Sequence, residues 1–239
     1  MKGEFLILSN KPDIDRNIYA DKSSVILYWL LLVGKNKKLF SIREVAKECN
    51  LSLGLVQRVF KILTLKGYLQ TIGIRTSKKF NLSNSKDLLK SWEDNYNIIE
   101  KCKIWTYRSP FQTKEKVFQT LIENKLEKKV VLALHSAAEA CGYKNTNLNT
   151  IELYILEKDL RIEIEKKLLL EPQEKGYEII LIEPYYKTIL DKFSKPCDKN
   201  ILCSPILLTY LDLCQFPLRG EEQAIFILQR DKILKTFMK

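Results

Sequence analysis

The stretch NLSLGLVQRVFKIL, residues 50–63, carries side chains whose types and spacing suit contacts with nucleic-acid bases. Arg58 can donate two hydrogen bonds to guanine O6 and N7, and the amide of Gln57 can pair with adenine N6 and N7. Lys61 follows Arg58 at helical spacing and suits a phosphate contact. This chemistry requires a helix that holds the three side chains on one exposed face.

The same stretch has the pattern of an amphipathic helix. Ser52 is a preferred N-cap residue and Gly67 stands where glycine ends helices, so we predict a helix from Leu53 to about Lys66. Its apolar residues fall at the spacing of a buried stripe: Val56, Val59, Phe60 and Leu63. Ser52, Leu53 and Gly54 then join the outer face, where small residues near the helix start let the backbone approach a groove wall.

A second helix is expected directly before this one. Ser41 and Glu44 have the S-x-x-E spacing of a capping box, which marks a helix start. The residues predicted to share its buried face are Ile42, Val45, Ala46 and Cys49. Only three residues, NLS, separate it from the next helix, so the two helices must cross sharply. Arg43 on the first of them suits a phosphate contact.

Two further elements frame this pair of helices. A helix is predicted from Asp21 to about Val33, with Asp21 or Ser23 as its cap and Gly34 as its stop. The segment YLQTIGIRTSKKFNL, residues 68–82, predicts a strand, a tight turn and a strand. Its tip carries the cations Arg75, Lys78 and Lys79, which suit phosphate neutralisation. This order of elements is typical of a winged helix-turn-helix, which binds DNA but also occurs as a protein-interaction module.

The positive charge is confined to the same part of the chain. The whole sequence has a net charge of +11, of which residues 1–82 hold +9, from 15 Lys and Arg against 6 Asp and Glu. Residues 83–239 hold 25 basic and 23 acidic residues, or only +2. An excess confined to one third of the chain indicates a polyanionic partner that docks there.

The pattern of elements predicts an α+β protein with two domains. Residues 1–82 form the winged-helix domain, whose first 20 residues we assign to an arm or edge segment. Residues 83–96 predict a linking helix at the start of the second domain, 83–239. Strand and helix patterns alternate through that domain, with LRIEIEKKLL as helix or strand, and two helices close the chain. They predict a small mixed α/β domain with a central sheet.

A search for catalytic residues in the second domain finds little. His135 stands beside Ser136, but no nucleophile elbow surrounds any serine. Glu-x-Lys triplets of nuclease type occur at residues 127–129 and 165–167, and solvated helix faces explain them more simply. The Gly-Ser loop and spaced carboxylates of nucleotidyl transfer are missing, so we expect no catalytic residue.

The other unusual residues do not change this expectation. Asp212, Arg219 and Glu222 could form a buried ion network that fixes a loop, or could line a binding surface. The six cysteines form no C-x-x-C pair and His135 is the only histidine, so we expect reduced thiols and neither a metal nor a cofactor. The longest apolar run, residues 23–33, is too short for a membrane span. With no signal-peptide pattern recognised, a cytoplasmic location without membrane contact is expected.

Three segments in this order carry a family resemblance: DLLKSWEDNY, VVLALHSAAEACGY and SPILLTYLDLCQFPLRGEEQA, following the winged helix. The chain resembles AbiEi-type transcriptional regulators, the antitoxins of type IV toxin-antitoxin systems, over about residues 40–230. The resemblance implies a winged helix that represses its own operon and a C-terminal domain needed to antagonise a nucleotidyltransferase-like toxin. That antagonism need not involve stable contact with the toxin.

We therefore expect a DNA-binding transcriptional regulator without enzymatic activity. Its partner would be double-stranded DNA of its own promoter. DNA-binding dimers read half-sites about 34 to 36 Å apart, so a homodimer would suit this role, although no dimerisation helix stands out. Two alternatives stay open: an RNA-processing or nuclease-like enzyme with a basic substrate-binding domain, and an adaptor whose winged helix binds protein.

Overall fold

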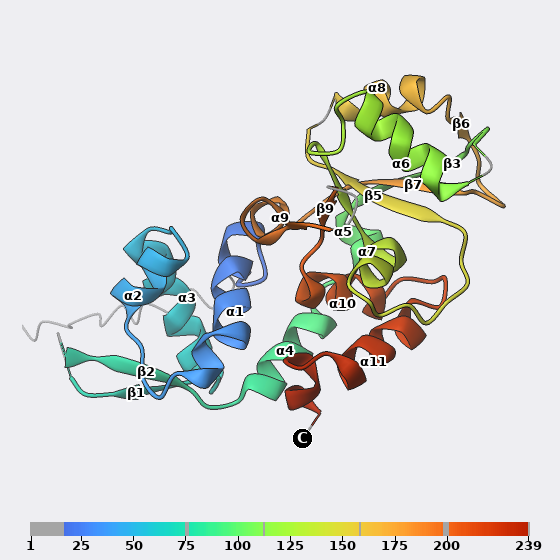
Figure 1. Ribbon diagram of the computed structural model, residues 1–239. Coiled ribbons are helices and arrows are strands. Elements are labelled where there is room, and N and C mark those ends of the chain that lie inside the picture. The colour runs from blue at the N-terminus through green and yellow to red at the C-terminus, as the bar shows by residue number, and fades with distance from the viewer. Residues whose placement is uncertain (1–16, 75–76, 112, 158, 198–200, 239) are drawn as a thin grey trace, which may run out of the picture.

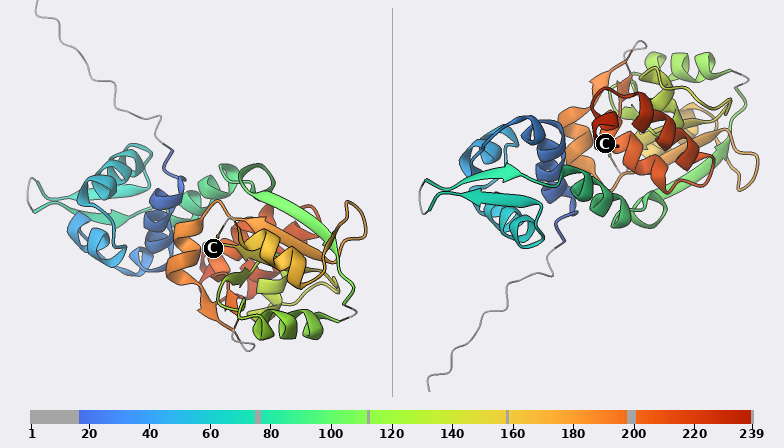
Figure 2. Two further views of the ribbon diagram at one scale, coloured as in Figure 1. Left: turned by 90° about the horizontal axis from the view of Figure 1, so that it is seen from above. Right: turned by 90° about the horizontal axis from the view of Figure 1, so that it is seen from below.

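The computed structural model describes residues 17–74, 77–111, 113–157, 159–197 and 201–238. These residues form a mixed α+β structure with eleven α-helices and two sheets (Figure 1). The described residues of 17–82 form one lobe and those from 83 onward form a second, with α1 and α9 at their junction (Figure 2). None of the described helices is both long and apolar enough to cross a membrane.

Three helices and a two-stranded ribbon make up the first lobe. The helices are α1 (Asp21–Leu32), α2 (Ile42–Glu48) and α3 (Leu53–Leu65), and a 3₁₀ turn, Gly34–Asn36, follows α1. The strands β1 (Leu69–Ile72) and β2 (Lys79–Leu82) pair antiparallel, with Leu69 opposite Leu82. Phe40, just before α2, adds a one-residue bridge to Phe80 of β2. The ribbon is therefore fastened to both ends of the helix pair.

Local signals explain where α2 and α3 begin and end. Both hydrogen bonds of the Ser41 and Glu44 capping box are present. The Ser52 hydroxyl accepts from the Leu55 amide at the start of α3. Gly67 has a φ of +78°, which glycine adopts without strain, and the Tyr68 amide donates to the Leu63 carbonyl. These predicted caps are confirmed.

The start of α1 differs from the prediction. No side chain caps this helix, which follows Ala20. Asp21 instead accepts hydrogen bonds from the amide and hydroxyl of Thr188, in the first turn of α9 (Lys187–Phe193). Its carboxylate therefore occupies the end of another helix, where unpaired amides favour negative charge. Gly34 does not have a positive φ and is therefore no left-handed stop. A Cβ there would lie 3.0 Å from the Trp29 ring, so the glycine serves close packing.

Helix α1 is buried on all sides because it lies between the two lobes. On one side, Trp29 meets Phe40 with ring centroids 5.2 Å apart, and this contact begins an aromatic chain through Phe60 to Phe80 of the ribbon. On the other side, Tyr28 stacks on Phe193 of α9 at 4.3 Å. A helix that is apolar all round can satisfy both neighbours. The hydrophobic core therefore continues past residue 82. The domain boundary at this residue stays a prediction.

The second lobe is built on a seven-stranded mixed sheet. Its strands are β3 (Lys103–Arg108), β4 (Val130–Leu132), β5 (Ile151–Ile155), β6 (Glu171–Pro172), β7 (Ile179–Glu183), β8 (Lys195–Pro196) and β9 (Leu202–Cys203), in the order β6-β3-β7-β5-β4-β9-β8. The pairs β5/β7 and β4/β9 are parallel and the other pairs are antiparallel.

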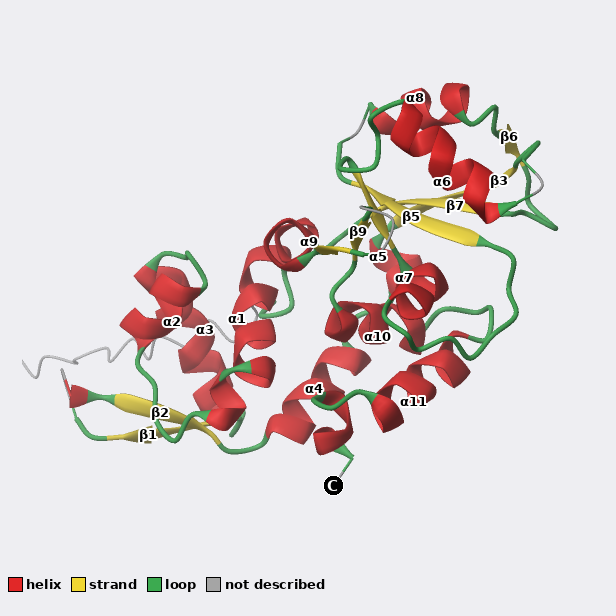
Figure 3. Ribbon diagram, in the orientation of Figure 1, coloured by secondary structure: helices red, strands yellow, loops and turns green. Residues whose placement is uncertain are grey.

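Helices cover both faces of this sheet (Figure 3). The remaining helices are α4 (Ser85–Asp94), α5 (Ile98–Lys101), α6 (Lys114–Glu123), α7 (Leu134–Ala140), α8 (Leu160–Lys167), α10 (Ile206–Cys214) and α11 (Gly220–Arg230). Alternate residues of β5 enter different cores: Ile151, Leu153 and Ile155 join the cluster beneath α6 and α8, and Tyr154 joins the larger cluster on the other face. Burial on both faces explains why the central strands β5 and β7 are apolar apart from Glu152 and Glu183.

The predicted elements of the second lobe are mostly present. The linking helix is α4, and the segment LRIEIEKKLL forms a helix, α8. Strand β3 and helix α6 lie in residues 97–129, for which no element was predicted. The two ends of β3 are exposed, its middle residues are half-buried and Tyr107 alone is buried, so its apolar pattern is weak.

Candidate nucleic-acid interface

The predicted base-contacting residues share one exposed face of α3. Gln57, Arg58 and Lys61 are exposed, as are Ser52 and Gly54 at the helix start. Leu53 is 51% exposed at the beginning of this face and Leu65, which the sequence analysis did not single out, is 58% exposed at its end. Their spacing of three and four residues places these side chains in one row along the helix.

The opposite side of α3 is buried, as predicted. Val56, Val59, Phe60 and Leu63 are at most 3% exposed, and Ile62 joins them. On α2, Val45, Ala46 and Cys49 are buried as expected, whereas Ile42 is half-buried. The core between α2, α3 and the ribbon therefore fixes which side of α3 faces the solvent.

Gly54 leaves room beside the guanidinium group of Arg58. A Cβ on Gly54 would lie 3.7 Å from Arg58 Nη1, an ordinary contact distance, and would touch nothing else within 4 Å. The glycine is therefore not needed for packing within the protein. What it provides is a bare stretch of backbone on the exposed face of the first helical turn.

The cations of this region have no acidic neighbours in the sequence. Residues 50–84 contain six basic residues and no acidic residue. Among those that the structure describes, Arg58, Lys61, Lys66, Lys78 and Lys79 are exposed and make no ion pair. Lys78 lies over the Phe80 ring at 5.9 Å from its centroid. An uncompensated group of this kind creates a positive potential that attracts polyanions.

The few acidic groups of the first lobe are already engaged. Lys37 forms ion pairs with Glu44 at 2.5 Å and with Glu48 at 3.0 Å. The indole of Trp29 donates to Glu48 at 2.6 Å, and this bond together with Lys37 lowers the pKa of the Glu48 carboxyl. The same two carboxylates raise the pKa of Lys37. Neither acid is available to neutralise the cations of α3.

The remaining predicted phosphate contacts lie elsewhere. Arg43 is exposed on α2 and belongs to a different helix from the α3 residues. Lys79 begins β2 and Lys78 precedes it, so both lie at the turn end of the ribbon. Arg75 lies outside the described residues. The ribbon also exposes two apolar side chains, Ile72 at 49% and Ile74 at 78%.

The second lobe contains a buried carboxyl group that corrects one prediction. Asp212 is fully buried and accepts hydrogen bonds from Tyr96 at 2.7 Å and Tyr154 at 2.6 Å. Burial raises the pKa of Asp212 to about 7, although both hydroxyls act in the opposite direction. Arg219 pairs instead with Glu222 at 2.6 Å on the surface. The predicted buried network of these three charges is therefore wrong: Asp212 is satisfied by tyrosines.

The candidate catalytic groups have structural partners. His135 is buried, with Nε2 2.8 Å from the Leu218 carbonyl oxygen. Ser136 donates from both its amide and its hydroxyl to the buried carboxylate of Glu152. Glu165, from one of the nuclease-type triplets, accepts from Tyr107 and pairs with Arg161 at 2.9 Å. No nucleophile and base are brought together among these groups.

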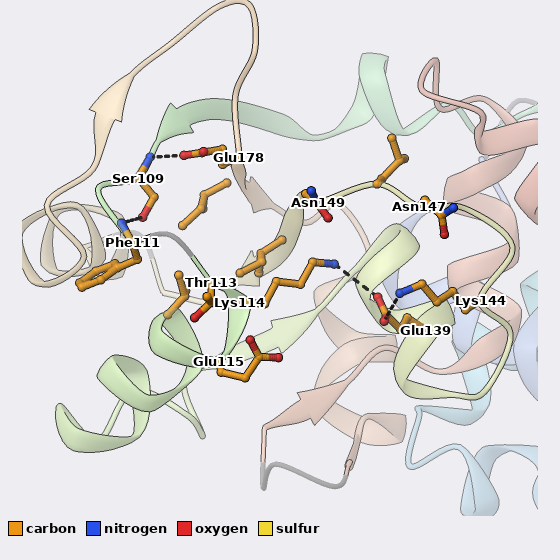
Figure 4. A pocket seen from close by; sticks show the side chains of 14 residues that line it. Ser109, Phe111, Thr113, Lys114, Glu115, Glu139, Lys144, Asn147, Asn149 and Glu178 are labelled. Atoms are coloured by element: carbon orange, nitrogen blue, oxygen red, sulfur yellow. Dashed lines mark hydrogen bonds and ion pairs between the residues drawn. The ribbon is translucent and has the colours of Figure 1, made fainter.

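A polar cavity of about 600 Å³ lies beside the start of α6 (Figure 4). Glu139 lies on one side of it and receives ion pairs from Lys114 at 3.3 Å and Lys144 at 2.6 Å. On the other side, Glu178 accepts from the Ser109 amide at 2.9 Å. The charged groups that line the cavity are largely satisfied by ion pairs and hydrogen bonds. Sequence reasoning gave no signal for this cavity, because its walls come from four separate segments.

Neither metal-binding residues nor similarity to known proteins adds to the description of this candidate interface. The described residues contain no group of three or more His, Cys, Asp or Glu side chains that could hold a metal ion. No family model matches the chain, and comparison with curated proteins and with solved structures finds no match.

Proposed function

We propose that the protein is a sequence-specific DNA-binding transcriptional regulator, in which residues 17–82 act as a winged helix-turn-helix. The observation that carries the proposal is the exposed face of α3, where Gln57, Arg58 and Lys61 lie in one row without an acidic partner. Helix α3 would enter the major groove and the β1/β2 ribbon would contact the adjacent backbone. The order of α2, the short turn, α3 and the ribbon supports this assignment.

The residues divide into two roles in this proposal. Arg58 and Gln57 read base edges, because their side chains offer paired donors and acceptors. Lys61, Arg43, Arg75, Lys78 and Lys79 neutralise phosphates, and Ser52, Leu53 and Gly54 bring the start of α3 close to the groove wall. The first group determines sequence preference, and the second group determines affinity for any duplex and its dependence on salt.

Binding of the full-length protein to labelled duplexes tests the proposal. Fluorescence anisotropy should show salt-dependent binding that is tighter for the promoter of the protein's own gene than for a shuffled duplex. Arg58→Ala should weaken promoter binding by about 1 to 3 kcal/mol and leave shuffled-duplex binding much less affected. Lys90→Ala on α4, whose side chain already pairs with Asp94 at 3.1 Å, is the matched control. Absence of salt-dependent binding to the promoter would contradict the proposal.

We further propose that the protein is an autoregulating antitoxin of the AbiEi type, acting in the cytoplasm. This part rests on the sequence resemblance, and no feature of the second lobe carries it by itself. A nucleotidyltransferase-like gene beside that of the protein would support it. Expression of that neighbour should arrest growth, and coexpression of the full chain should relieve the arrest. Growth arrest that persists with the full chain would remove the antitoxin part and leave the regulator.

One observation favours a second candidate, a protein-binding winged helix. Leu53, Leu65, Ile72 and Ile74 are large apolar side chains that α3 and the ribbon expose. Exposed apolar groups next to cations fit an acidic partner protein with an apolar contact surface. Recovery of such a partner by the intact chain, but not by the Ile74→Asp variant, together with no affinity for duplex DNA, would favour this candidate over DNA binding.

A further inference from the structure

Two cysteines that are far apart in the sequence meet in the second lobe. Cys141 immediately follows α7, and Cys203 lies in β9. They are 62 positions apart, yet their Sγ atoms are 3.6 Å apart. Both are free thiols. A disulfide bond needs an Sγ separation of about 2.05 Å, so the sulfurs are in contact and have little distance left to close.

The two thiols have unlike surroundings. Cys141 is exposed and therefore accessible to a dissolved oxidant, whereas Cys203 is only 7% exposed. The Cys203 thiol is also 3.6 Å from the carbonyl oxygens of Ala137 and Ser204, which hold it beside the end of α7. An accessible sulfur with a shielded sulfur in contact is the arrangement that a reacting cysteine and a resolving cysteine require.

The same contact shifts the pKa values of the two thiols in opposite directions. A hydrogen bond from the Cys203 thiol lowers the pKa of Cys141, against the opposing effects of burial and of the Asp231 carboxylate. That hydrogen bond and burial raise the pKa of Cys203. Cys141 is therefore the sulfur that ionises first, and the thiolate is the nucleophilic form.

We propose that Cys141 and Cys203 form an oxidisable thiol pair, which a peroxide converts into an intramolecular disulfide. The Cys141 thiolate attacks one peroxide oxygen and the O–O bond breaks, which leaves a sulfenic acid on Cys141 and a hydroxide that takes up a proton. The Cys203 sulfur then attacks Cys141 Sγ, the S–O bond breaks, and the departing hydroxide leaves as water with the Cys203 proton. Two thiols lose two electrons, and one peroxide becomes two waters.

The bond would add a covalent link between the end of α7 and β9. Cys203 lies opposite Leu132 in the parallel pair β4/β9, and Cys141 ends the helix that follows β4. The cross-link would tie the end of α7 to the sheet and close a loop through β5, α8 and β7. Glu139 on the same helix lines the polar cavity, so oxidation would restrain one wall of that cavity. This modification site does not depend on the DNA-binding proposal.

Peptide mapping of the intact, reduced protein tests the proposal. The protein is treated with graded hydrogen peroxide, its remaining thiols are blocked with N-ethylmaleimide, and it is digested without reductant. We expect a peptide that joins Cys141 to Cys203, two fewer N-ethylmaleimide adducts than on the blocked reduced protein, and recovery of both thiols with dithiothreitol. Native protein that accumulates sulfinic acid on Cys141 without this peptide, or that forms only intermolecular disulfides, would overturn the proposal.

Three variants separate the roles of the two sulfurs. Cys203→Ser should stop at a sulfenic acid on Cys141, which dimedone traps, and Cys141→Ser should leave Cys203 unreacted at the same peroxide dose. Cys197→Ser removes another half-buried thiol of this lobe and should leave the cross-link unchanged. Because Cys141 is exposed, its variant should fold even where the buried Cys203 variant does not. If Cys197→Ser abolishes the cross-link, the assignment of the pair to Cys141 and Cys203 is wrong.

Discussion

The two lobes treat charged side chains in opposite ways. In residues 50–84 the described cations are exposed and unpaired, and no acid is present in the sequence. In the second lobe, several cations are matched, as in the pairs Lys103 with Glu183, Lys187 with Glu183 and Arg161 with Glu165. Matched surface pairs add little to stability, but they cancel the local field. Residues 50–84, whose described cations are unmatched, are therefore the part suited to a polyanion.

Carboxyl groups show the same contrast in a different form. In the first lobe, Glu44 and Glu48 lie at the surface and are held by Lys37. In the second lobe, Asp212 is fully buried without any cation and depends on two tyrosine hydroxyls. The acids of the first lobe are thus paired at the surface and leave the described cations of residues 50–84 free, whereas the buried carboxyl group of Asp212 affects the stability of the core.

The largest expected effect concerns this buried carboxyl group. Its pKa is about 7 in the folded protein, above the ordinary 3.8, so the folded state binds the proton more tightly. The stabilisation is fully present below pH 3.8 and is lost as pH rises to about 7. Relative to Asp212→Asn, the free energy of unfolding of the natural protein should fall by up to about 4 kcal/mol between pH 4 and 7. Urea unfolding at several pH values measures this.

The surface carboxylate Glu222 provides a control of opposite sign. Arg219 lowers its pKa, so its contribution is present above the ordinary value and is lost as pH falls. Glu222→Gln should therefore change the pH dependence only on the acidic side. If Asp212→Asn leaves the slope between pH 4 and 7 unchanged, the buried group does not titrate in the folded protein.

Charge reversal on α3 should break the contrast between the lobes. The double variant Arg58→Glu and Lys61→Glu puts two acids on the face proposed to meet DNA, and like-charge contact costs several kcal/mol. Promoter affinity should fall by ~100-fold or more, which corresponds to about 2.7 kcal/mol. Lys90→Glu in the second lobe should have a much smaller effect. Equal losses in the two lobes would show that net charge, and not this face, governs binding.

The ribbon cations should have a smaller effect that does not depend on sequence. Lys78→Ala and Lys79→Ala each remove one cation near the ribbon turn. Each variant should weaken binding to promoter and shuffled duplexes alike, and should reduce the slope of log affinity against log salt by about one. Titrations at several salt concentrations measure both. A change in sequence preference without a change in slope would contradict a phosphate-contacting role.

The smallest effect should come from Gly54. Its place in the first turn of α3 admits a Cβ at ordinary contact distance, so Gly54→Ala should stabilise the protein by about 0.5 to 1 kcal/mol through helix propensity. If the bare backbone of this turn approaches the groove wall, the same variant should bind the promoter more weakly. Thermal unfolding and anisotropy on one preparation separate these outcomes. Greater stability with unchanged affinity would show that the turn does not approach DNA closely.

The sequence by itself determined the local elements of the first lobe and the surface of α3. Ser41 with Glu44, Ser52 and Gly67 mark helix ends through bonds to neighbours a few residues away, and such signals are complete within a short window. The period of the apolar residues fixed which side of α3 is buried. The clustering of cations was also visible because charge is a property of composition.

Tertiary structure alone decided how distant segments meet. Asp21 looks like an ordinary helix cap, but its carboxylate caps a helix 167 positions away. In the sequence, Asp212 looks like a partner for a nearby arginine, but in the structure two tyrosines from other segments donate hydrogen bonds to it. Cys141 and Cys203 come into contact only because β9 pairs with β4. Such contacts follow from strand order and helix docking, which depend on the packing of the whole core and on no short stretch of sequence.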